Sequence, residues 1–119
     1  MIDTLIPQAE RIARLNDRVR HGLDRSARTV ITHGVMAEFC DEDVPSAIIA
    51  QAQIMREIRL HDFAEDAHGE RDFGKITFRG RDIYFKIDYF DLSLEYGSED
   101  PADASQTTRV LTIMLSEEY

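Results

Sequence analysis

The stretch of residues 82–90 constrains the fold most, because apolar and polar side chains alternate along it. Its inward set is Ile83, Phe85, Ile87 and Tyr89. A period of two is typical of a β-strand that buries one face. Residues 75–78 alternate in the same way, and residues 79–82 supply a glycine for a tight turn. The sequence therefore predicts an antiparallel hairpin whose second arm is the central strand of a sheet.

Two amphipathic helices are predicted before the hairpin, over about residues 5–23 and 44–61. Apolar residues of the first recur at spacings of three and four, at Leu5, Ala9, Ile12, Leu15, Val19 and Leu23. The second places on one face Ile48, Ala52, Met55 and Ile58. Such spacing is typical of a helix that buries one side. Pro7 and Pro45 suit first turns, where a missing N–H costs no helical hydrogen bond.

The remaining segments predict two more strands and a loop. The β-branched residues in 28–32 favour a short strand that ends near His33, which we interpret as structural. The apolar run 109–115 suits either a buried strand or a helix, and its shortness with its Val, Thr and Ile favours the strand. Residues 61–74 are expected to form a loop that Phe63 and Phe73 anchor to the core.

These elements predict an α+β fold in the order α-β-α-β-β-β. We expect a two-layer domain in which two helices pack on one face of three to four antiparallel strands. A length of 119 residues suits a single domain, 1–119. The lone Cys40 cannot form an internal disulfide, and we interpret it as a structural residue. No apolar run reaches the roughly 20 residues of a membrane span, and the first residues do not resemble a targeting peptide, so we expect a cytoplasmic protein.

Negative charge is concentrated in one part of the chain. The net charge is −9, and residues 61–104 hold twelve acidic against five basic residues, for −7. Such a field repels nucleic acid and attracts basic surfaces. The arginines of the first helix alternate with acids and have no aromatic residue among them, which indicates a solvated helix face. We therefore expect no direct binding of nucleic acid.

Some acidic residues and histidines could form a divalent metal site for phosphodiester hydrolysis. The candidates are Asp88, Asp91, Glu95, His61 and His68. Asp88 and Asp91 are an odd number of residues apart, which points their side chains to opposite faces of a straight strand. The serines lack a nucleophile elbow, and the glycines are too scattered for a phosphate loop. We expect no catalytic residue, no metal site, no cofactor and no enzymatic activity, with a hydrolase using Asp88 and Asp91 as an alternative.

Five segments of the chain carry a family resemblance. They are RLND (14–17), GERDFG (69–74), KIDYFD (86–91), YGSEDPAD (96–103) and TRVLTIMLSEEY (108–119). Together they resemble a family of small proteins classed only as a domain of unknown function. The resemblance implies an origin mostly among alphaproteobacteria, often on plasmids and other mobile elements, and it assigns no catalytic residue. Residues 26–60 match least, so the first strand and second helix rest on pattern alone.

Small acidic proteins of mobile elements resemble inhibitors of host defence, such as anti-CRISPR and anti-restriction proteins. A DNA duplex carries one negative charge per about 1.7 Å of axis, and carboxylates at a similar density can occupy a groove of Lys and Arg. We therefore predict a binding protein that occupies the basic DNA-binding surface of a nucleic-acid-binding protein or CRISPR effector complex. The expected partner-binding residues are Glu70, Asp72, Asp88, Asp91, Glu95, Glu99, Asp100 and Asp103.

A second hypothesis needs no mimicry of DNA. An acidic accessory or regulatory protein of a mobile element would use the same charge mainly to stay soluble. The dependence of partner binding on salt concentration separates the two hypotheses, because only a charged interface weakens strongly as ionic strength rises.

Overall fold

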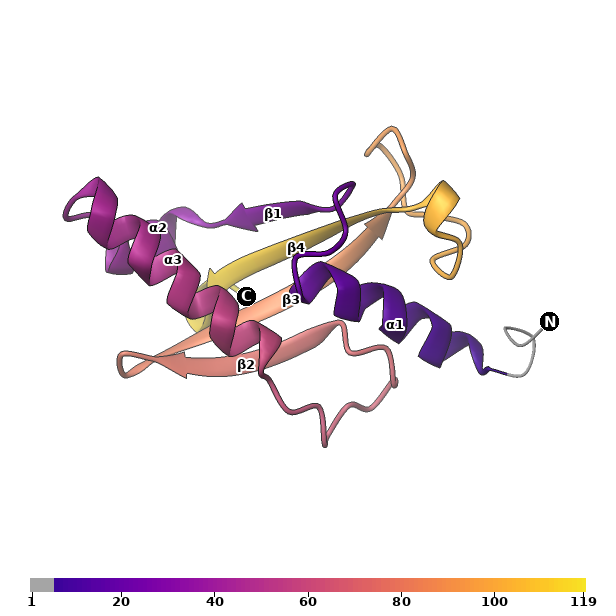
Figure 1. The fold of residues 1–119 in the computed structure, drawn as a ribbon, viewed down its shortest axis with the longest axis horizontal. Coiled ribbons are helices and arrows are strands. Elements are labelled where there is room, and N and C mark those ends of the chain that lie inside the picture. Colours follow the sequence, from indigo (N-terminus) through magenta and orange to yellow (C-terminus); the bar gives the residue numbers. More distant parts are fainter. Residues whose placement is uncertain (1–5) are drawn as a thin grey trace.

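A four-stranded sheet forms one layer of the structure, and three helices pack on one of its faces (Figure 1). The computed structural model describes residues 6–119. Its helices are α1 (Gln8–Arg20), α2 (His33–Phe39) and α3 (Val44–Arg59). Its strands are β1 (Arg28–Ile31), β2 (Phe73–Phe78), β3 (Arg81–Phe90) and β4 (Thr108–Leu115). Two short 3-10 helices, η2 (Ala104–Gln106) and η3 (Ser116–Glu118), flank β4.

The predicted hairpin is confirmed. Strands β2 and β3 pair antiparallel, and the two residues Arg79 and Gly80 join them. Both have positive φ angles, 50° and 81°, as a tight two-residue hairpin turn requires. A glycine accepts such an angle without the steric cost of a Cβ atom, so the position of Gly80 helps to set the register of the hairpin.

Strand β3 also buries the side chains that its alternation predicted. Ile83 and Phe85 are fully buried and Ile87 is almost so. Residues 109–115 lie within strand β4, which pairs with β3 along its length and adds Leu111 and Ile113 to the same core. The strand interpretation of this run is confirmed, and β3 and β4 share the centre of the sheet.

The α+β class is confirmed, with two differences from the predicted arrangement. The sheet has the order β1-β4-β3-β2 and is mixed, because β1 pairs parallel to β4. A third helix, α2, follows β1 directly and makes the element order α-β-α-α-β-β-β. The Thr32 side chain accepts a hydrogen bond from the backbone N–H of Val35 and starts this helix. His33 is therefore its first residue and not the end of a strand.

The buried faces of the helices agree only in part with those expected, since Ile12, Val19 and Ile58 are buried as predicted. The predicted start of the first helix at residue 5 lies outside the described residues, and α1 ends at Arg20, so Leu23 is 58% exposed beyond it. Helix α3 buries Ala50, Ile54 and Ile58, whereas Ile48 is 61% exposed and Ala52 is also exposed. Apolar residues occur on more than one side of α3, so their spacing alone does not identify the buried face.

The prediction for one of the two loop anchors, Phe73, is wrong. Phe63 packs against the core as expected. Phe73 is 40% exposed and instead contacts Tyr84 and Tyr119, with ring centroids 5.3 Å away in each pair. Phe73 begins β2, and the alternation of that strand turns Gly74 toward the core and Phe73 to the opposite face of the sheet.

Residues 6–119 contain no helix that is both long and apolar enough to span a membrane. All three helices instead contribute buried residues to the core beneath the sheet, at Val19, Val35, Phe39, Ala50, Ile54 and Ile58. None of the helices α1, α2 and α3 covers the opposite face of the sheet (Figure 1).

Replacing Phe85 with Ala should lower the free energy of unfolding by about 2–5 kcal/mol, because a fully buried ring leaves a cavity between sheet and helices. Urea denaturation measures the change. Lys86→Ala is the control, since its ammonium pairs with Asp88 on a partly exposed surface and such pairs contribute less than about 1 kcal/mol. Equal losses in the two variants would contradict the assignment of Phe85 to the core.

Candidate functional site

The structure divides the predicted partner-binding acids between two places. Glu70, Asp72 and Asp88 lie near the start of β2. The other five follow β3 in consecutive loops at one end of the molecule (Figure 1). We call this second group, with the loops of residues 91–103 that carry it, the acidic end; its acids are Asp91, Glu95, Glu99, Asp100 and Asp103.

Hydrogen-bonded turns build the acidic end. Asp91 Oδ1 accepts from Ser93 Oγ at 2.7 Å and from the backbone N–H of Glu95 at 3.2 Å. Asp103 accepts from both the backbone N–H and the hydroxyl of Ser105 and starts η2. Hydrogen bonds from Ser93 and Ser105, respectively, are the main causes that lower the pKa values of Asp91 and Asp103. These carboxylates are ionised parts of the turn architecture.

Two acids of this end have no such internal role. Glu95 and Glu99 are exposed, and neither carboxylate accepts a hydrogen bond or joins a salt bridge among residues 6–119. Leu92 and Tyr96 lie in the same loop, and Tyr96 is 71% exposed. The acidic end therefore presents free carboxylates beside exposed apolar and aromatic surface, and a buried Tyr or apolar centre within a polar rim is typical of a protein interface.

The basic residues of the acidic segment 61–104 do not neutralise it. Arg71 pairs with Glu10 and Asp17, both outside the segment. Arg81 likewise pairs with acids outside the segment, Glu38 and Glu117. Within the part of the chain that the structure describes, Asp88 is the one acid of the segment in a salt bridge, with Lys86. Most of the −7 of this segment is thus left without an ion-pair partner.

Glu70 belongs to a buried polar network between α1 and the sheet. Its Oε1 accepts from the hydroxyl of Tyr89 at 2.7 Å, and burial is the main cause that raises the pKa of that hydroxyl. Asn16, fully buried in α1, donates to the Tyr89 hydroxyl at 2.8 Å and to the Glu70 carbonyl at 2.9 Å. Arg109 Nε donates to Asn16 Oδ1 at 2.8 Å. The carboxylate of Glu70 is therefore engaged within the fold.

Arg71 extends this network to the surface of α1. Its Nε and one terminal nitrogen donate to the two carboxylate oxygens of Asp17, at 2.9 and 2.8 Å, and its other terminal nitrogen donates to Glu10 at 3.1 Å. Arg109 also donates to the carbonyl of Pro101. All five segments that carry the family resemblance therefore supply a member of one network. A structural role accounts for these polar motif residues.

Sequence reasoning missed Asn16 and Arg109 as buried polar residues, although each leaves a signal. Asn16 falls among the apolar positions of α1, between the buried Ile12 and Val19. Arg109 is in phase with the inward residues Leu111 and Ile113 of β4. A polar residue at an inward position indicates a buried partner, since an unpaired one is costly.

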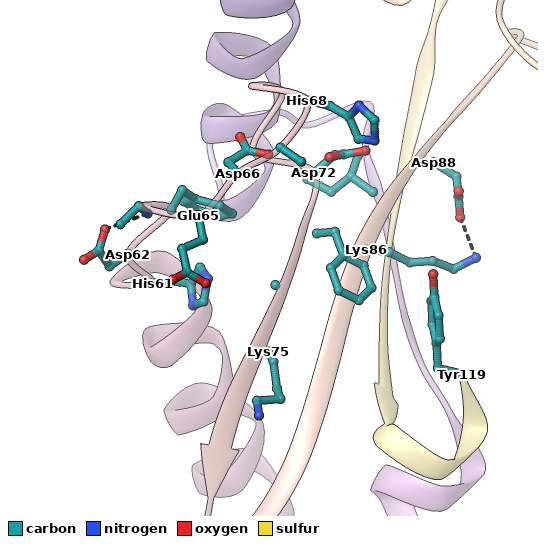
Figure 2. A pocket seen from close by; sticks show the side chains of 16 residues that line it. His61, Asp62, Glu65, Asp66, His68, Asp72, Lys75, Lys86, Asp88 and Tyr119 are labelled. Atoms are coloured by element: carbon teal, nitrogen blue, oxygen red, sulfur yellow. Dashed lines mark hydrogen bonds and ion pairs between the residues drawn. The ribbon is translucent and has the colours of Figure 1, made fainter.

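A cavity of about 860 Å³ lies beside the start of β2 (Figure 2). The loop of residues 61–68 forms one wall, and β2, β3 and Tyr119 form the rest. Asp72 lines it, and burial, followed by the nearby charges of Glu70 and Asp66, raises its pKa. His61 also lines it, and burial lowers the pKa of its imidazole.

The candidate metal residues are only partly brought together. His61, His68 and Asp88 line this cavity, whereas Asp91 and Glu95 belong to the acidic end beyond β3. Within residues 6–119 no three side chains of His, Cys, Asp or Glu lie close enough to hold a metal ion together. Asp88 also pairs with Lys86 at 3.1 Å, which satisfies its charge.

Residues 31–118 match a protein family described as Protein of unknown function (DUF3768). The chain belongs to this family. The match confirms the domain of unknown function expected from the motifs. No curated protein and no solved structure matches the chain. The part matched to DUF3768 contains Glu70, Arg71, Tyr89 and Arg109, and it begins after α1, which supplies their partners Asn16 and Asp17.

Replacing Asn16 with Ala should destabilise the protein by about 2–4 kcal/mol, because the buried guanidinium of Arg109 and the hydroxyl of Tyr89 each lose a hydrogen-bond partner. Arg14→Ala on the same helix is the control, since its exposed pair with Glu10 should contribute about 0.5 kcal/mol or less. Thermal unfolding measures both. A similar, small loss in the two variants would show that the network does not hold α1.

Acidification should weaken the ion pairs of Arg71 with Glu10 and Asp17. Hydrogen bonds from Arg71, then Arg14, lower the pKa of Glu10 below its ordinary 4.5. Burial tends to raise the pKa of Asp17, but Arg71 and Arg20 outweigh it and bring the value below 3.8. Because both folded pKa values lie below the unfolded ones, the stabilisation is complete above about pH 5 and is lost as pH falls through the folded values.

Urea midpoints measured from about pH 5 to about pH 3 should therefore fall less steeply in Arg71→Gln than in the native protein. Arg56→Gln is the control, because it makes the same charge change at an exposed position of α3. Its slope should match that of the native protein. Parallel slopes in all three proteins would contradict the stabilising role of Arg71.

Proposed function

We propose that the protein is a small acidic binding protein that inhibits a nucleic-acid-handling defence complex, of the anti-CRISPR or anti-restriction type, by occupying its basic DNA-binding surface. The observation that carries the proposal is the −7 of residues 61–104, in which Asp88 is the one acid with a salt-bridge partner among the described residues. A surface that keeps its negative charge unpaired attracts Lys and Arg side chains of a partner.

The geometry of the acidic end supports the proposal. Glu95 and Glu99 are exposed in loops that Asp91, Asp100 and Asp103 hold by turn hydrogen bonds. Charges that are already positioned lose little conformational freedom on binding, which favours affinity. The exposed Leu92 and Tyr96 add apolar area that a basic groove can cover around its charged contacts.

The proposed mechanism is competition. Carboxylates of the acidic end would pair with the Lys and Arg side chains that otherwise contact phosphates, so the partner could not hold DNA and this protein together. Long-range attraction should make association fast at low salt, and screening should weaken it as ionic strength rises.

An acidic accessory or regulatory role in a mobile element, without mimicry of DNA, is the alternative. It is favoured by the turn hydrogen bonds of Asp91 and Asp103, since those carboxylates have a structural use of their own. In that case the partner surface need not be a nucleic-acid-binding one, and DNA would not compete for it.

Affinity capture from a host with CRISPR and restriction systems, followed by duplex DNA competition, tests the proposal. Glu95→Lys combined with Glu99→Lys should reduce the affinity for the captured partner by at least about tenfold, because each change replaces attraction with repulsion. The matched control is Asp41→Lys with Glu42→Lys, which makes the same charge change in the exposed α2–α3 connection at the opposite end (Figure 1).

The control should bind almost as well as the native protein, and the native complex should weaken with salt and with added duplex DNA. If both double variants lost affinity equally, net charge and not the acidic end would govern binding. If the partner bound DNA and this protein together, the mechanism of competition would be wrong.

A further inference from the structure

Strand β2 is an edge of the sheet, and its outer side has no neighbouring strand among the described residues. The backbone N–H of Ile87 donates to the carbonyl of Asp72 at 2.8 Å, which sets the pattern of hydrogen bonds along the β2–β3 ladder. Residues of β2 then alternate between bonding to β3 and pointing away from it.

The outward set is Phe73, Lys75 and Thr77. Each of these residues forms a non-hydrogen-bonded pair with the β3 residue opposite it. The backbone N–H and C=O of each of the three residues therefore point away from β3, to the outer edge. No backbone or side-chain group within residues 6–119 bonds to these N–H and C=O groups. An unpaired row of this kind is a template for one more strand.

The edge is bordered by the cavity described above. The loop of residues 61–68 contacts β2 at its start, where His61 lies against Gly74, and the cavity of about 860 Å³ lies beside the strand, with the acids of the loop on one side of it (Figure 2). The carboxylates around the cavity belong to Asp62, Glu65, Asp66, Asp72 and Asp88. Its cationic side chains are Lys75 and Lys86, and Lys86 is already paired with Asp88. The space beside the strand is therefore both open and negatively charged.

We propose that the β2 edge binds an extended segment of a partner protein as a fifth strand, with Lys or Arg side chains of that segment directed into the cavity. The unpaired backbone groups would supply the affinity, and alternate side chains of the added strand would supply selectivity. The excess of carboxylates around the cavity selects basic side chains. The inference stands apart from the acidic end, because it rests on other residues.

A second copy of this chain is a poorer occupant of the edge. Two β2 strands that paired antiparallel through their outward residues, centred on the middle one, would place Lys75 opposite Lys75, and like charges directly opposite each other destabilise a ladder. A lysine on an exposed edge strand is also a common device against self-association. A partner strand without a cation at that point escapes the repulsion.

Amide hydrogen exchange followed by NMR tests the proposal on the full chain. The probe is a short synthetic peptide that alternates lysine and valine. Its saturable binding should slow exchange at Lys75 and Thr77, whose N–H groups point outward, by about tenfold or more. Exchange at Ile76, already bonded to β3, should change little. Binding without this alternating protection, or the absence of saturable binding, would overturn the proposal.

Two modified peptides identify the contacts. A peptide methylated on the backbone nitrogens that would face β2 should bind at least about tenfold more weakly, because it cannot donate to the edge. A peptide with glutamate in place of lysine should lose a similar factor through repulsion. Equal binding by either peptide would overturn the proposal, as would protection of Lys75 that rises with protein concentration alone, which would indicate a second copy.

Variants of the protein complete the test. Lys75→Pro removes one outward N–H without removing a bond to β3 and should abolish peptide binding. Thr29→Pro is the matched control at the β1 edge, because the hydrogen bond from Thr32 N to Ile113 O implies that the N–H of Thr29 also points outward. It should bind the peptide normally. Unchanged binding by a folded Lys75→Pro would overturn the proposal, and the modified peptides test it on the native protein.

Discussion

The hydrogen bond from Arg109 to Asn16 is the contact on which the arrangement of the fold depends. Arg109 is 2% exposed, so its guanidinium needs partners inside the protein. It finds the side chain of Asn16, the carbonyl of Pro101 and the ring of Tyr89, whose centroid lies 5.0 Å from the guanidinium carbon. Helix α1, strands β3 and β4 and the loop before η2 thus meet at one cation. None of them can shift alone without leaving a buried charge or amide unsatisfied.

This arrangement connects the core to the surface that we propose for binding. The carbonyl of Pro101 belongs to the acidic end, and Ser98 and Asp100 of the same loop bond to the hydroxyl of Thr107, directly before β4. The acidic end is therefore attached at several points to the most buried strands. Loops held by a rigid scaffold are where binding residues commonly lie. Glu95 and Glu99 make none of these contacts themselves. The contacts of neighbouring loop residues nevertheless give their free carboxylates a defined position.

The sequence was sufficient for the parts of the fold that periodicity and turn chemistry determine. The β2–β3 hairpin, the strand at 109–115 and the presence of two long helices follow from local patterns of apolar residues. The buried face of α3 does not, since Ile48 and Ala52 of the predicted face are exposed. The parallel pairing of β1 depends on contacts between residues far apart in the sequence, and the outward face of Phe73 depends on a shift of one residue, neither of which local patterns encode. The short helix α2 does have a local signal in its cap, Thr32, which the prediction of a strand end near His33 overlooked. The buried pair Asn16 and Arg109 was missed because the hydrogen-bond partner that explains the burial of each side chain lies far away in the sequence. For the candidate site, the sequence identified the acidic residues. It did not show which carboxylates stabilise turns, because this depends on hydrogen bonds from neighbours such as Ser93 and Ser105.

Within the described part of the chain, Asp72 is a partly buried acid without a salt bridge, unlike the acids that arginines or turn hydrogen bonds stabilise. Glu10 and Asp17 pair with arginines, and Asp91 and Asp103 accept turn hydrogen bonds. Asp72 is partly buried beside Glu70 and Asp66, and it joins no salt bridge among residues 6–119. Because its folded pKa is raised, its ionisation disfavours the folded state as pH rises through that value. A residue that lowers stability in this way is expected mainly where function requires it. Asp72 lines the cavity beside the unpaired edge of β2. A cationic side chain of a bound strand would there reduce the repulsion among the carboxylates of Asp72, Glu70 and Asp66.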